Sequence, residues 1–377
     1  MDPSDASTRA QAWAATMAGN PRDGVVVAHE GSALKLRSPR WIGRADREAA
    51  EDGWLAAGAT RAVGAGDRTR AEEPDPERTC FERDRDRILH STAFRRLAGK
   101  TQVFVHPADH QRTRLTHALE VAQVATSVAR AVGLNVALTE AIALGHDCGH
   151  GPGGHASEEA FDPFLAEGYD HAVWGGIALE PLNLCAQTLD GIRNHSWSRP
   201  APSTVEGEVV SWADRCAYTA HDLEDAIDAG IVVADALPAE VTALCGQRRG
   251  DQLSTFIRAL VDCITETGTV GMKAEIAAAL AALREFNYRR IYTRPESQAQ
   301  GRAVVAVLRA LVDYYGDRPH ALPEPAAADP GSPEALRAAV HYVGGMTDRY
   351  AFQTALSLLD WDPDRLPRGI DMPVRRG

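Results

Sequence analysis

Residues 144–158 read Leu-Gly-His-Asp-Cys-Gly-His-Gly-Pro-Gly-Gly-His-Ala-Ser-Glu. Three histidines and two carboxylic acids fall within this short stretch. Imidazole and carboxylate groups together suit a divalent cation of hard or borderline character. The glycines let the backbone approach a ligand closely, because they carry no Cβ atom. A His-Asp dipeptide that ends an apolar helix and runs into such a turn predicts a metal-centred site for phosphoryl chemistry.

The composition favours a helical globular protein. The chain has 377 residues, of which 44% are hydrophobic and 6% aromatic, and strand-like alternation of apolar and polar residues is scarce. No apolar run reaches the ~18–20 residues of a membrane span, and the first residues lack the pattern of a signal peptide. Six scattered cysteines fit reduced thiols rather than a disulfide framework. We therefore expect a cytoplasmic protein that does not contact a membrane.

The charge is acidic overall but uneven. A net charge of −12 argues against a general nucleic-acid coat protein. Segment 82–114 is the exception, because it carries eight Lys and Arg residues against four acids. A local basic segment on an acidic protein suits a small polyanion held in a pocket.

The helical periodicity predicts one large all-α domain with appendages. Residues 1–80 show weak periodicity and predict a partly irregular N-terminal arm. A catalytic core is expected over residues 81–230, and a C-terminal helical part over 231–377 completes the substrate pocket. The pattern predicts helices over 112–132, which stops at Gly133, and over 139–147, 181–195, 206–229, 253–266, 272–292, 300–315 and 334–358.

Two further positions extend the His146-Asp147 pair to a four-residue ligand set. His117 lies in the middle of a predicted helix, where a lone histidine is usually a surface or core residue. An antiparallel helix pair brings it beside His146, however. Asp214 follows the apolar run Val-Val-Ser-Trp-Ala, where an unpaired acid is costly to bury. The alternative is an amphipathic helix whose solvent face happens to carry acids.

Four motifs in order resemble the deoxyguanosinetriphosphate triphosphohydrolase-like dNTPases of the HD-domain superfamily. They are Phe94-Arg-Arg-Leu-Ala-Gly-Lys-Thr-Gln-Val-Phe104, Arg112-Thr-Arg-Leu-Thr-His117-Ala-Leu-Glu-Val121, the stretch 146–158, and Ala213-Asp214-x-x-Ala-Tyr218-x-x-His-Asp222. The resemblance runs from about residue 80 to residue 360. It implies an all-α HD phosphohydrolase fold with additional C-terminal helices. It also implies hydrolysis of a dNTP to a deoxynucleoside and intact triphosphate by attack at the α-phosphorus.

The resemblance also assigns roles to individual residues. The implied metal ligands are His117, His146, Asp147 and Asp214. The implied catalytic residues are His155, the acid Glu158 that orients it, and His150, which faces the phosphates. The residues expected to contact substrate are Arg114, Lys100, Tyr218, Asp222, Arg284, Tyr288 and Tyr292. Within the last group, a tyrosine that stacks under the deoxyribose would exclude a 2′-hydroxyl.

Some features of the chain depart from the family. Residues 151–154 read Gly-Pro-Gly-Gly where many relatives carry an aromatic residue, and Cys148 stands where an aliphatic residue is common. Tyr288 stands where some relatives have histidine. These differences leave the base preference open more than the chemistry.

Cofactors and partners follow from the same reasoning. Two histidines and two aspartates suit Mg²⁺, Mn²⁺, Fe²⁺, Co²⁺ or Zn²⁺. The expected partners are a dNTP substrate, a dNTP as a possible allosteric effector, and further copies of the chain in a homo-oligomer; a nucleic acid is not predicted. Two alternatives stay open: another HD phosphohydrolase, such as a 5′-nucleotidase or a hydrolase of a nucleotide analogue, and a catalytically silent nucleotide sensor or single-strand nucleic-acid binder. The released product separates the first alternative from the leading hypothesis, and tight dNTP binding without turnover would favour the second.

Overall fold

The computed structural model describes residues 7–107 and 110–369. The chain divides into two compact units, residues 1–42 and 43–377. The smaller unit contains helix α1 (Thr8–Ala15) and an antiparallel hairpin of β1 (Asn20–Arg22) and β2 (Val25–Val27).

The larger unit is all-α over its described residues, which confirms the predicted fold class. Its α-helices are α2 (Arg44–Trp54), α3 (Cys80–His90), α4 (Thr92–Arg96), α5 (Arg114–Val132), α6 (Val136–Gly145), α7 (Ala156–Phe161), α8 (His171–Leu179), α9 (Ala186–Arg193), α10 (Val205–Asp228), α11 (Ala239–Cys245), α12 (Arg249–Thr267), α13 (Ala274–Asn287), α14 (Pro295–Asp317), α15 (Pro333–Gly344) and α16 (Asp348–Leu358). Short 3₁₀ segments lie at η2 (Leu97–Gly99), η3 (Asp162–Phe164), η4 (Glu180–Leu182), η5 (Ala234–Ala236), η7 (Pro319–Ala321) and η8 (Pro363–Arg365).

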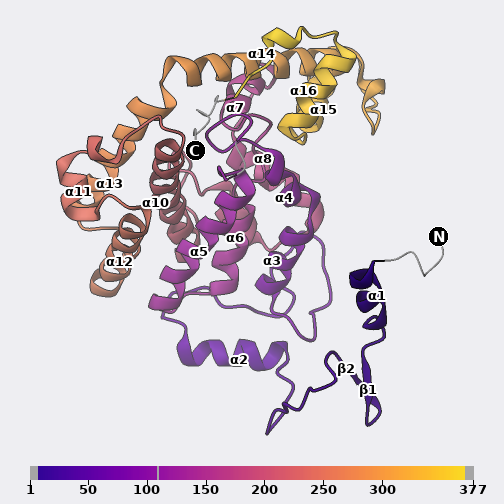
Figure 1. Cartoon of the computed structure of the whole chain (residues 1–377), viewed down its shortest axis with the longest axis vertical. Helices are drawn as coiled ribbons and strands as arrows, with labels where there is room; N and C mark the ends of the chain where they lie inside the picture. Colours follow the sequence, from indigo (N-terminus) through magenta and orange to yellow (C-terminus); the bar gives the residue numbers. More distant parts are fainter. Residues whose placement is uncertain (1–6, 108–109, 370–377) are drawn as a thin grey trace. The chain divides into compact units, whose positions relative to one another are not determined.

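Helices α5, α6 and α10 form the centre of the main hydrophobic core, with α3 on one side and α12 on the other (Figure 1). The apolar face of α5 fills this core with Val121, Val124 and Val128, which recur at helical spacing and are fully buried. As predicted, α5 ends at Gly133, whose φ of 72° is the left-handed conformation that favours glycine at a helix end. The residues of the candidate site lie at the N-terminal end of α5 and at the C-terminal end of α6.

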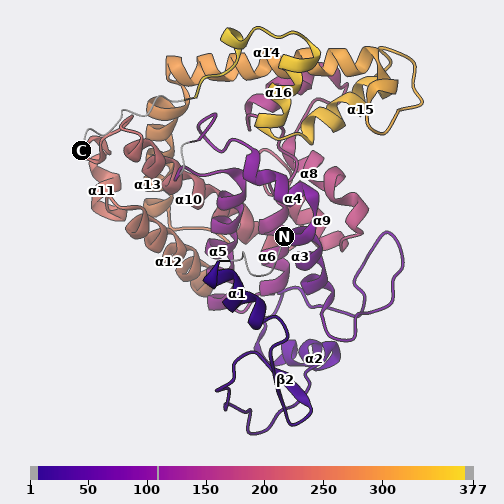
Figure 2. The ribbon, with the colours of Figure 1, turned by 45° about the vertical axis from the view of Figure 1, so that its right-hand side comes forward.

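A second hydrophobic core joins the C-terminal helices to the middle of the chain. Helix α14 lies beside α15 and α16 (Figure 2) and also packs against α7. The same core includes Phe161 and Trp174 from the segment that follows the HD dipeptide. The sequence pattern predicted one last helix over 334–358. The structure instead has α15 and α16, which are separated at Gly345, because Thr347 caps a new helix by accepting a hydrogen bond from the backbone of Tyr350.

One further helix differs from the prediction. The pattern predicted a continuous α-helix over 272–292, but α13 ends at Asn287 and continues as a π-helical turn, η6 (Tyr288–Tyr292). Such turns shift the side chains that follow them around the helix axis. Among the described helices, none combines the length and the apolar character that crossing a membrane requires.

Candidate functional site

The four predicted metal ligands meet at the junction of three helices. His117 lies in the first turns of α5, His146 and Asp147 follow the last turn of α6, and Asp214 lies in the middle of α10. The contacts of α5 with α6 and of α10 with both helices bring these segments together. His117, His146 and Asp147 are buried.

The ligand atoms converge on a small volume. His117 Nε2 lies 3.0 Å from Asp214 Oδ1 and 3.8 Å from Asp147 Oδ2. His146 Nε2 lies 3.5 Å from Asp147 Oδ1 and 3.6 Å from Asp214 Oδ1. His117, His146 and Asp147 form one group of potential ligands within 4.8 Å of one another, and His146 and Asp214 belong to a second group. The cluster can therefore hold a metal ion.

Hydrogen bonding fixes the orientation of the His146 ring. Its Nδ1 lies 2.6 Å from the carbonyl oxygen of Ala143, one turn earlier in α6. If Nδ1–H donates to that carbonyl, Nε2 keeps a lone pair that faces two carboxylates, as in ligand histidines fixed by a backbone carbonyl. Burial acts to lower the pKa of His146, but Asp147 and Asp214 outweigh it and raise the pKa to about 9. In the absence of a metal ion, His146 Nε2 therefore carries a proton.

The two aspartates are ionised. Burial acts to raise the pKa of Asp147, yet the charges of Arg114 and His146 hold that pKa well below its usual range. Burial acts in the same direction on Asp214, where a hydrogen bond from His117 and the charge of His146 hold the pKa well below its usual range. The buried carboxylate of Asp147 and the half-buried carboxylate of Asp214, beside two imidazoles, demand positive charge at this point.

Arg114 connects this cluster to the turn that follows it. Its Nη1 donates to Asp147 Oδ2 at 2.8 Å, and both side chains are buried. Its Nε and Nη2 have no hydrogen-bond partner among the described residues, although both are buried. Buried guanidinium donors without a partner are costly, and they suit an oxyanion that arrives with the ligand.

The glycines of the turn make room for protein backbone. A Cβ atom on Gly149 would lie 2.0 Å from the carbonyl oxygen of His171 and 2.2 Å from the amide nitrogen of Gly175, both in α8. Gly154 has a φ of 62°, and its Cβ would lie 2.8 Å from the carbonyl oxygen of Thr101. From the sequence we expected close approach of a ligand. At these two positions the close neighbours are other segments of the chain.

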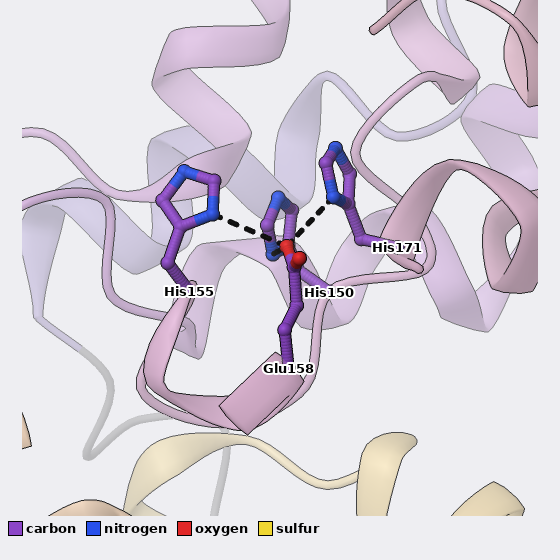
Figure 3. A group of neighbouring side chains, drawn as sticks. All are labelled: His150, His155, Glu158 and His171. Atoms are coloured by element: carbon purple, nitrogen blue, oxygen red, sulfur yellow. Dashed lines mark hydrogen bonds and ion pairs between the residues drawn. The ribbon is translucent and has the colours of Figure 1, made fainter. Parts of the chain in front are cut away.

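A second cluster lies directly beyond the turn. His150, His155 and His171 surround the carboxylate of Glu158, with His155 and His171 on opposite sides of it (Figure 3). The Nδ1 atoms of His171, His155 and His150 lie 2.7, 3.1 and 3.8 Å from Glu158 Oε1. Burial acts to raise the pKa of Glu158, but hydrogen bonds from His155 and His171 outweigh it and hold that pKa well below its usual range.

His150 links the two clusters. Its Nε2 lies 3.2 Å from Asp147 Oδ1, and its ring stacks on that of His171 with 3.9 Å between the ring centres. Burial and the charge of Arg114 hold the pKa of His150 well below its usual range, so the ring is neutral. His155, in contrast, has a side chain that is 75% exposed.

Two histidines at these clusters, His171 and His195, were not predicted as site residues from the sequence. His171 is the first residue of α8, and His195 follows α9. Their Nε2 atoms lie 3.2 Å apart, and both belong to a potential ligand group with Asp147. The only local signal is that Asp170 caps α8, which makes His171 the first residue of that helix.

Predicted substrate residues on α10, α13 and the π-helical turn η6 form two hydrogen-bonded pairs. Arg284 Nε donates to the Tyr218 hydroxyl at 2.7 Å, and the Tyr292 hydroxyl donates to Asp222 Oδ2 at 2.6 Å. Asp222 Oδ1 is buried and has no hydrogen-bond partner among the described residues. Burial raises the pKa of Asp222 to about 7.

The remaining two predicted substrate residues lie apart from these pairs. Tyr288 is 52% exposed, because the π-helical turn interrupts the expected stripe from Arg284 to Tyr292. Lys100 is buried, and its ammonium group donates to the carbonyl oxygens of His150 and Gly344. It lines a cavity of about 690 Å³ between the far side of the turn and α15. Burial lowers the pKa of Lys100 to about 8.

Much of the basic segment 82–114 is neutralised by acids of the same chain. Arg112 forms ion pairs with Glu120, Glu224 and Asp225. Arg83 and Arg87 both pair with Glu72. The expected basic patch is therefore largely internal, and Arg114 is the member with unpaired buried donors.

Comparison with known proteins agrees with this arrangement. Residues 114–219 match the HD domain, and residues 270–356 match the phosphohydrolase-associated domain. A deoxyguanosinetriphosphate triphosphohydrolase-like protein of Caldanaerobacter subterraneus subsp. tengcongensis is 40% identical over 292 residues, which cover 75% of this chain and 86% of that protein. Proteins described in the same words from Desulfatibacillum aliphaticivorans and Clostridium perfringens (strain 13 / Type A) are 42% and 43% identical, over 60% of this chain and 71% and 70% of theirs.

A solved structure of a hypothetical protein from Aquifex aeolicus matches 74% of this chain and 69% of that one, with a TM-score of 0.47 and 16% identity. The HD-domain match covers the segment that supplies His117, His146, Asp147 and Asp214. The chain belongs to the deoxyguanosinetriphosphate triphosphohydrolase-like family and is an HD-domain phosphohydrolase.

Proposed function

We propose that this protein hydrolyses deoxynucleoside triphosphates to a deoxynucleoside and inorganic triphosphate, with a divalent metal ion bound by His117, His146, Asp147 and Asp214. The observation that carries the proposal is the convergence of two imidazoles and two ionised carboxylates beside a buried arginine with free donors. The printed names of the relatives, which are about 40% identical, supply the substrate class.

The residues present fit a metal ion. Buried His146 Nε2 has no hydrogen-bond partner among the described residues and faces two carboxylate oxygens. A cation between these atoms satisfies all of them at once. When bound there, a divalent ion polarises a phosphoryl oxygen and makes nearby water a better nucleophile. The donor set suits Mn²⁺, Co²⁺, Fe²⁺, Zn²⁺ or Mg²⁺.

Arg114 is the proposed phosphate clamp. Asp147 holds one of its terminal nitrogens, which fixes the plane of the guanidinium group. The free Nε and Nη2 then present two parallel donors, the geometry that matches two oxygens of a phosphate group. This preorganised charge stabilises negative charge that develops as the α-phosphorus is attacked. Arg284 and Tyr218 are proposed to contact the more distant phosphates, and Lys100 to support the turn through His150.

His155 is the proposed proton-transfer residue. His155 Nδ1 donates a hydrogen bond to Glu158, which leaves His155 Nε2 as the ring atom presented to substrate. Hydrolysis breaks the bond between the α-phosphorus and the 5′ oxygen. The hydroxyl of water joins the phosphorus, and a proton must reach the departing 5′ oxygen. His155 supplies that proton as a general acid, while neutral His150 faces the phosphates.

The pair of Tyr292 and Asp222 is the proposed sugar site. The Tyr292 hydroxyl holds one carboxylate oxygen of Asp222, which leaves the other free to accept a hydrogen bond from a 3′-hydroxyl. The ring of Tyr292 then lies under the deoxyribose and leaves no room for a 2′-hydroxyl. Tyr288 is proposed to contact substrate from the exposed end of this helix. A homo-oligomer, a dNTP effector and a cytoplasmic location stay predictions from the sequence.

Product analysis tests the proposal. The protein is incubated with each of the four dNTPs, singly and in mixtures, with Mg²⁺, Mn²⁺ or Co²⁺, and the products are separated by anion exchange. Triphosphate and deoxynucleoside in equal amounts are expected, and Asp147→Ala should abolish their release while the helical circular dichroism spectrum is unchanged. Orthophosphate or pyrophosphate as the product would instead indicate another HD phosphohydrolase. Binding without turnover would indicate a nucleotide sensor.

A further inference from the structure

We propose that His150, His155, Glu158 and His171 form a second metal site, which takes a borderline divalent cation such as Zn²⁺ and whose occupancy switches the enzyme off. The site lies beyond the turn and shares no ligand with the His117–His146–Asp147–Asp214 cluster. The metal site itself stands on geometry alone, and only its inhibitory effect rests on the proposed role of His155.

The distances match a tetrahedral zinc site. Zn²⁺ binds imidazole nitrogen and carboxylate oxygen at about 2.0–2.1 Å, so two ligand atoms on a tetrahedron lie about 3.3 Å apart. The Nδ1 atoms of His171, His155 and His150 lie 2.7, 3.1 and 3.8 Å from Glu158 Oε1, on both sides of that value. The four potential ligand atoms all lie within 4.8 Å of one another. Only small side-chain shifts separate this arrangement from coordination.

The tautomer of His150 leaves a lone pair aimed into the site. His150 Nε2 lies 3.2 Å from Asp147 Oδ1, a distance at which the ring nitrogen donates a hydrogen bond to the carboxylate. His150 Nδ1 is then a hydrogen-bond acceptor, and it faces Glu158 Oε1, which is also an acceptor. This buried Nδ1 has no hydrogen-bond partner among the described residues. Such a pairing is unfavourable unless a cation lies between the two atoms.

A chain of hydrogen bonds gives His171 the same orientation. His195 Nδ1 lies 2.8 Å from the carbonyl oxygen of Ile192 and donates its proton there. His195 Nε2 is therefore an acceptor, and His171 Nε2 donates to it at 3.2 Å. His171 Nδ1 lies at hydrogen-bond distance from Glu158 Oε1, 2.7 Å, and a metal ion can replace the proton between these two atoms. A single cation in this space satisfies the Nδ1 atoms of both His150 and His171.

The fourth ligand, His155, explains how a metal ion reaches the site and why its binding inhibits the enzyme. The His155 side chain is 75% exposed, so its ring can turn without disturbing packed neighbours and solvent reaches the site. Three imidazoles suit Zn²⁺ better than Mg²⁺. Four protein ligands close the coordination shell, as in structural zinc sites that keep no position for water or substrate. With a metal ion on Nδ1, the only ring proton of His155 is on Nε2, and its loss would leave an imidazolate. An occupied site therefore makes His155 a poor general acid.

Metal stoichiometry tests the site without substrate. The protein is stripped with a chelator, dialysed against Zn²⁺, and analysed by mass spectrometry of the metal. We expect two equivalents in the wild type and one in His155→Ala or Glu158→Gln. His320→Ala removes an exposed histidine far along the chain and should keep two. Two equivalents in His155→Ala, or a single equivalent in the wild type that this variant keeps, would overturn the site.

Two further variants distinguish the proposed site from the other potential metal sites beside it. Asp147, His171 and His195 form another potential ligand group. Loss of one equivalent in His195→Ala but not in His155→Ala would assign the ion to that group instead. His117→Ala should retain the second equivalent, so failure of the first metal site does not affect the test. With dNTP, Zn²⁺ beyond one equivalent should slow triphosphate release at least tenfold. Binding of the second equivalent without this inhibition would overturn the switching role.

Discussion

Arg114 and Asp147 form a buried ion pair in which one terminal nitrogen of the guanidinium group donates to Oδ2 at 2.8 Å. Asp147 thereby contacts the phosphate clamp with one oxygen and faces the imidazoles of His146 and His150 with the other. The proposed ligand set and the proposed phosphate clamp are thus one electrostatic unit. A change in either partner should affect both stability and catalysis.

Replacing Arg114 with Gln should destabilise the metal-free protein by about 3 kcal/mol, because a buried carboxylate loses its charged partner. Mn²⁺ should restore part of that loss, since it supplies positive charge beside Asp147. We also expect kcat/KM for dNTP hydrolysis to fall about 100-fold. Urea unfolding with and without Mn²⁺ measures the first effect. Arg249→Gln, which breaks a surface ion pair, should cost less than about 1 kcal/mol, and equal losses in both variants would contradict the buried role.

Tyr292 should control the choice between deoxyribose and ribose. Tyr292→Ala opens space at the sugar and should lower the preference for dGTP over GTP by about 10–100-fold. Tyr292→Phe keeps the ring and loses only the hydroxyl that donates to Asp222. It should keep most of the preference while KM rises. The ratio of kcat/KM for the two nucleotides measures the effect, and an unchanged ratio in Tyr292→Ala would place the sugar elsewhere.

Asp222 should give the fold a pH dependence. Burial raises the pKa of this carboxyl to about 7, above its value of about 4 in an unfolded chain. Its favourable contribution is complete below pH ~4 and is lost as the pH rises through ~7. The Asp222→Asn variant has no titrating group at this position, so its stability does not fall in this way as the pH rises. The variant should therefore gain about 2 kcal/mol relative to wild type between pH 5 and pH 8. Urea unfolding at four pH values measures the difference, and parallel curves would contradict a raised pKa.

Gly149→Ala should be strongly destabilising, because its Cβ would meet the backbone of α8 at 2.0 Å. We expect a loss of about 3 kcal/mol and a displaced His171. Gly301 lies within α14, and its Cβ would meet nothing within 4 Å. Gly301→Ala should therefore stabilise the protein by about 0.5–1 kcal/mol. Thermal unfolding of both variants decides the point, and similar shifts in Tm would show that the turn tolerates a side chain.

The helix pattern and the HD dipeptide were readable from the sequence because their signals are local. The apolar spacing of α5 and its end at Gly133 follow from side-chain periodicity and backbone freedom. The break between α15 and α16 was missed, since the apolar residues continue across it and only the Thr347 cap marks it.

His171 and His195 could not be found from the sequence, because their neighbours come from distant segments. His171 reaches the site only because Gly149 lets α8 approach the turn at backbone distance. The neutralisation of Arg112 by acids on α5 and α10 is equally non-local. Residue spacing along one helix identifies a candidate ligand. Only tertiary contacts identify its hydrogen-bond and ion-pair partners.

The central claim is attack of water at the α-phosphorus with release of intact triphosphate. Hydrolysis of dGTP in ¹⁸O-labelled water, followed by mass spectrometry of both products, tests it most directly. We predict one ¹⁸O atom in the triphosphate and none in deoxyguanosine. Label in the deoxyguanosine hydroxyl, or pyrophosphate or orthophosphate as the labelled product, would contradict the account.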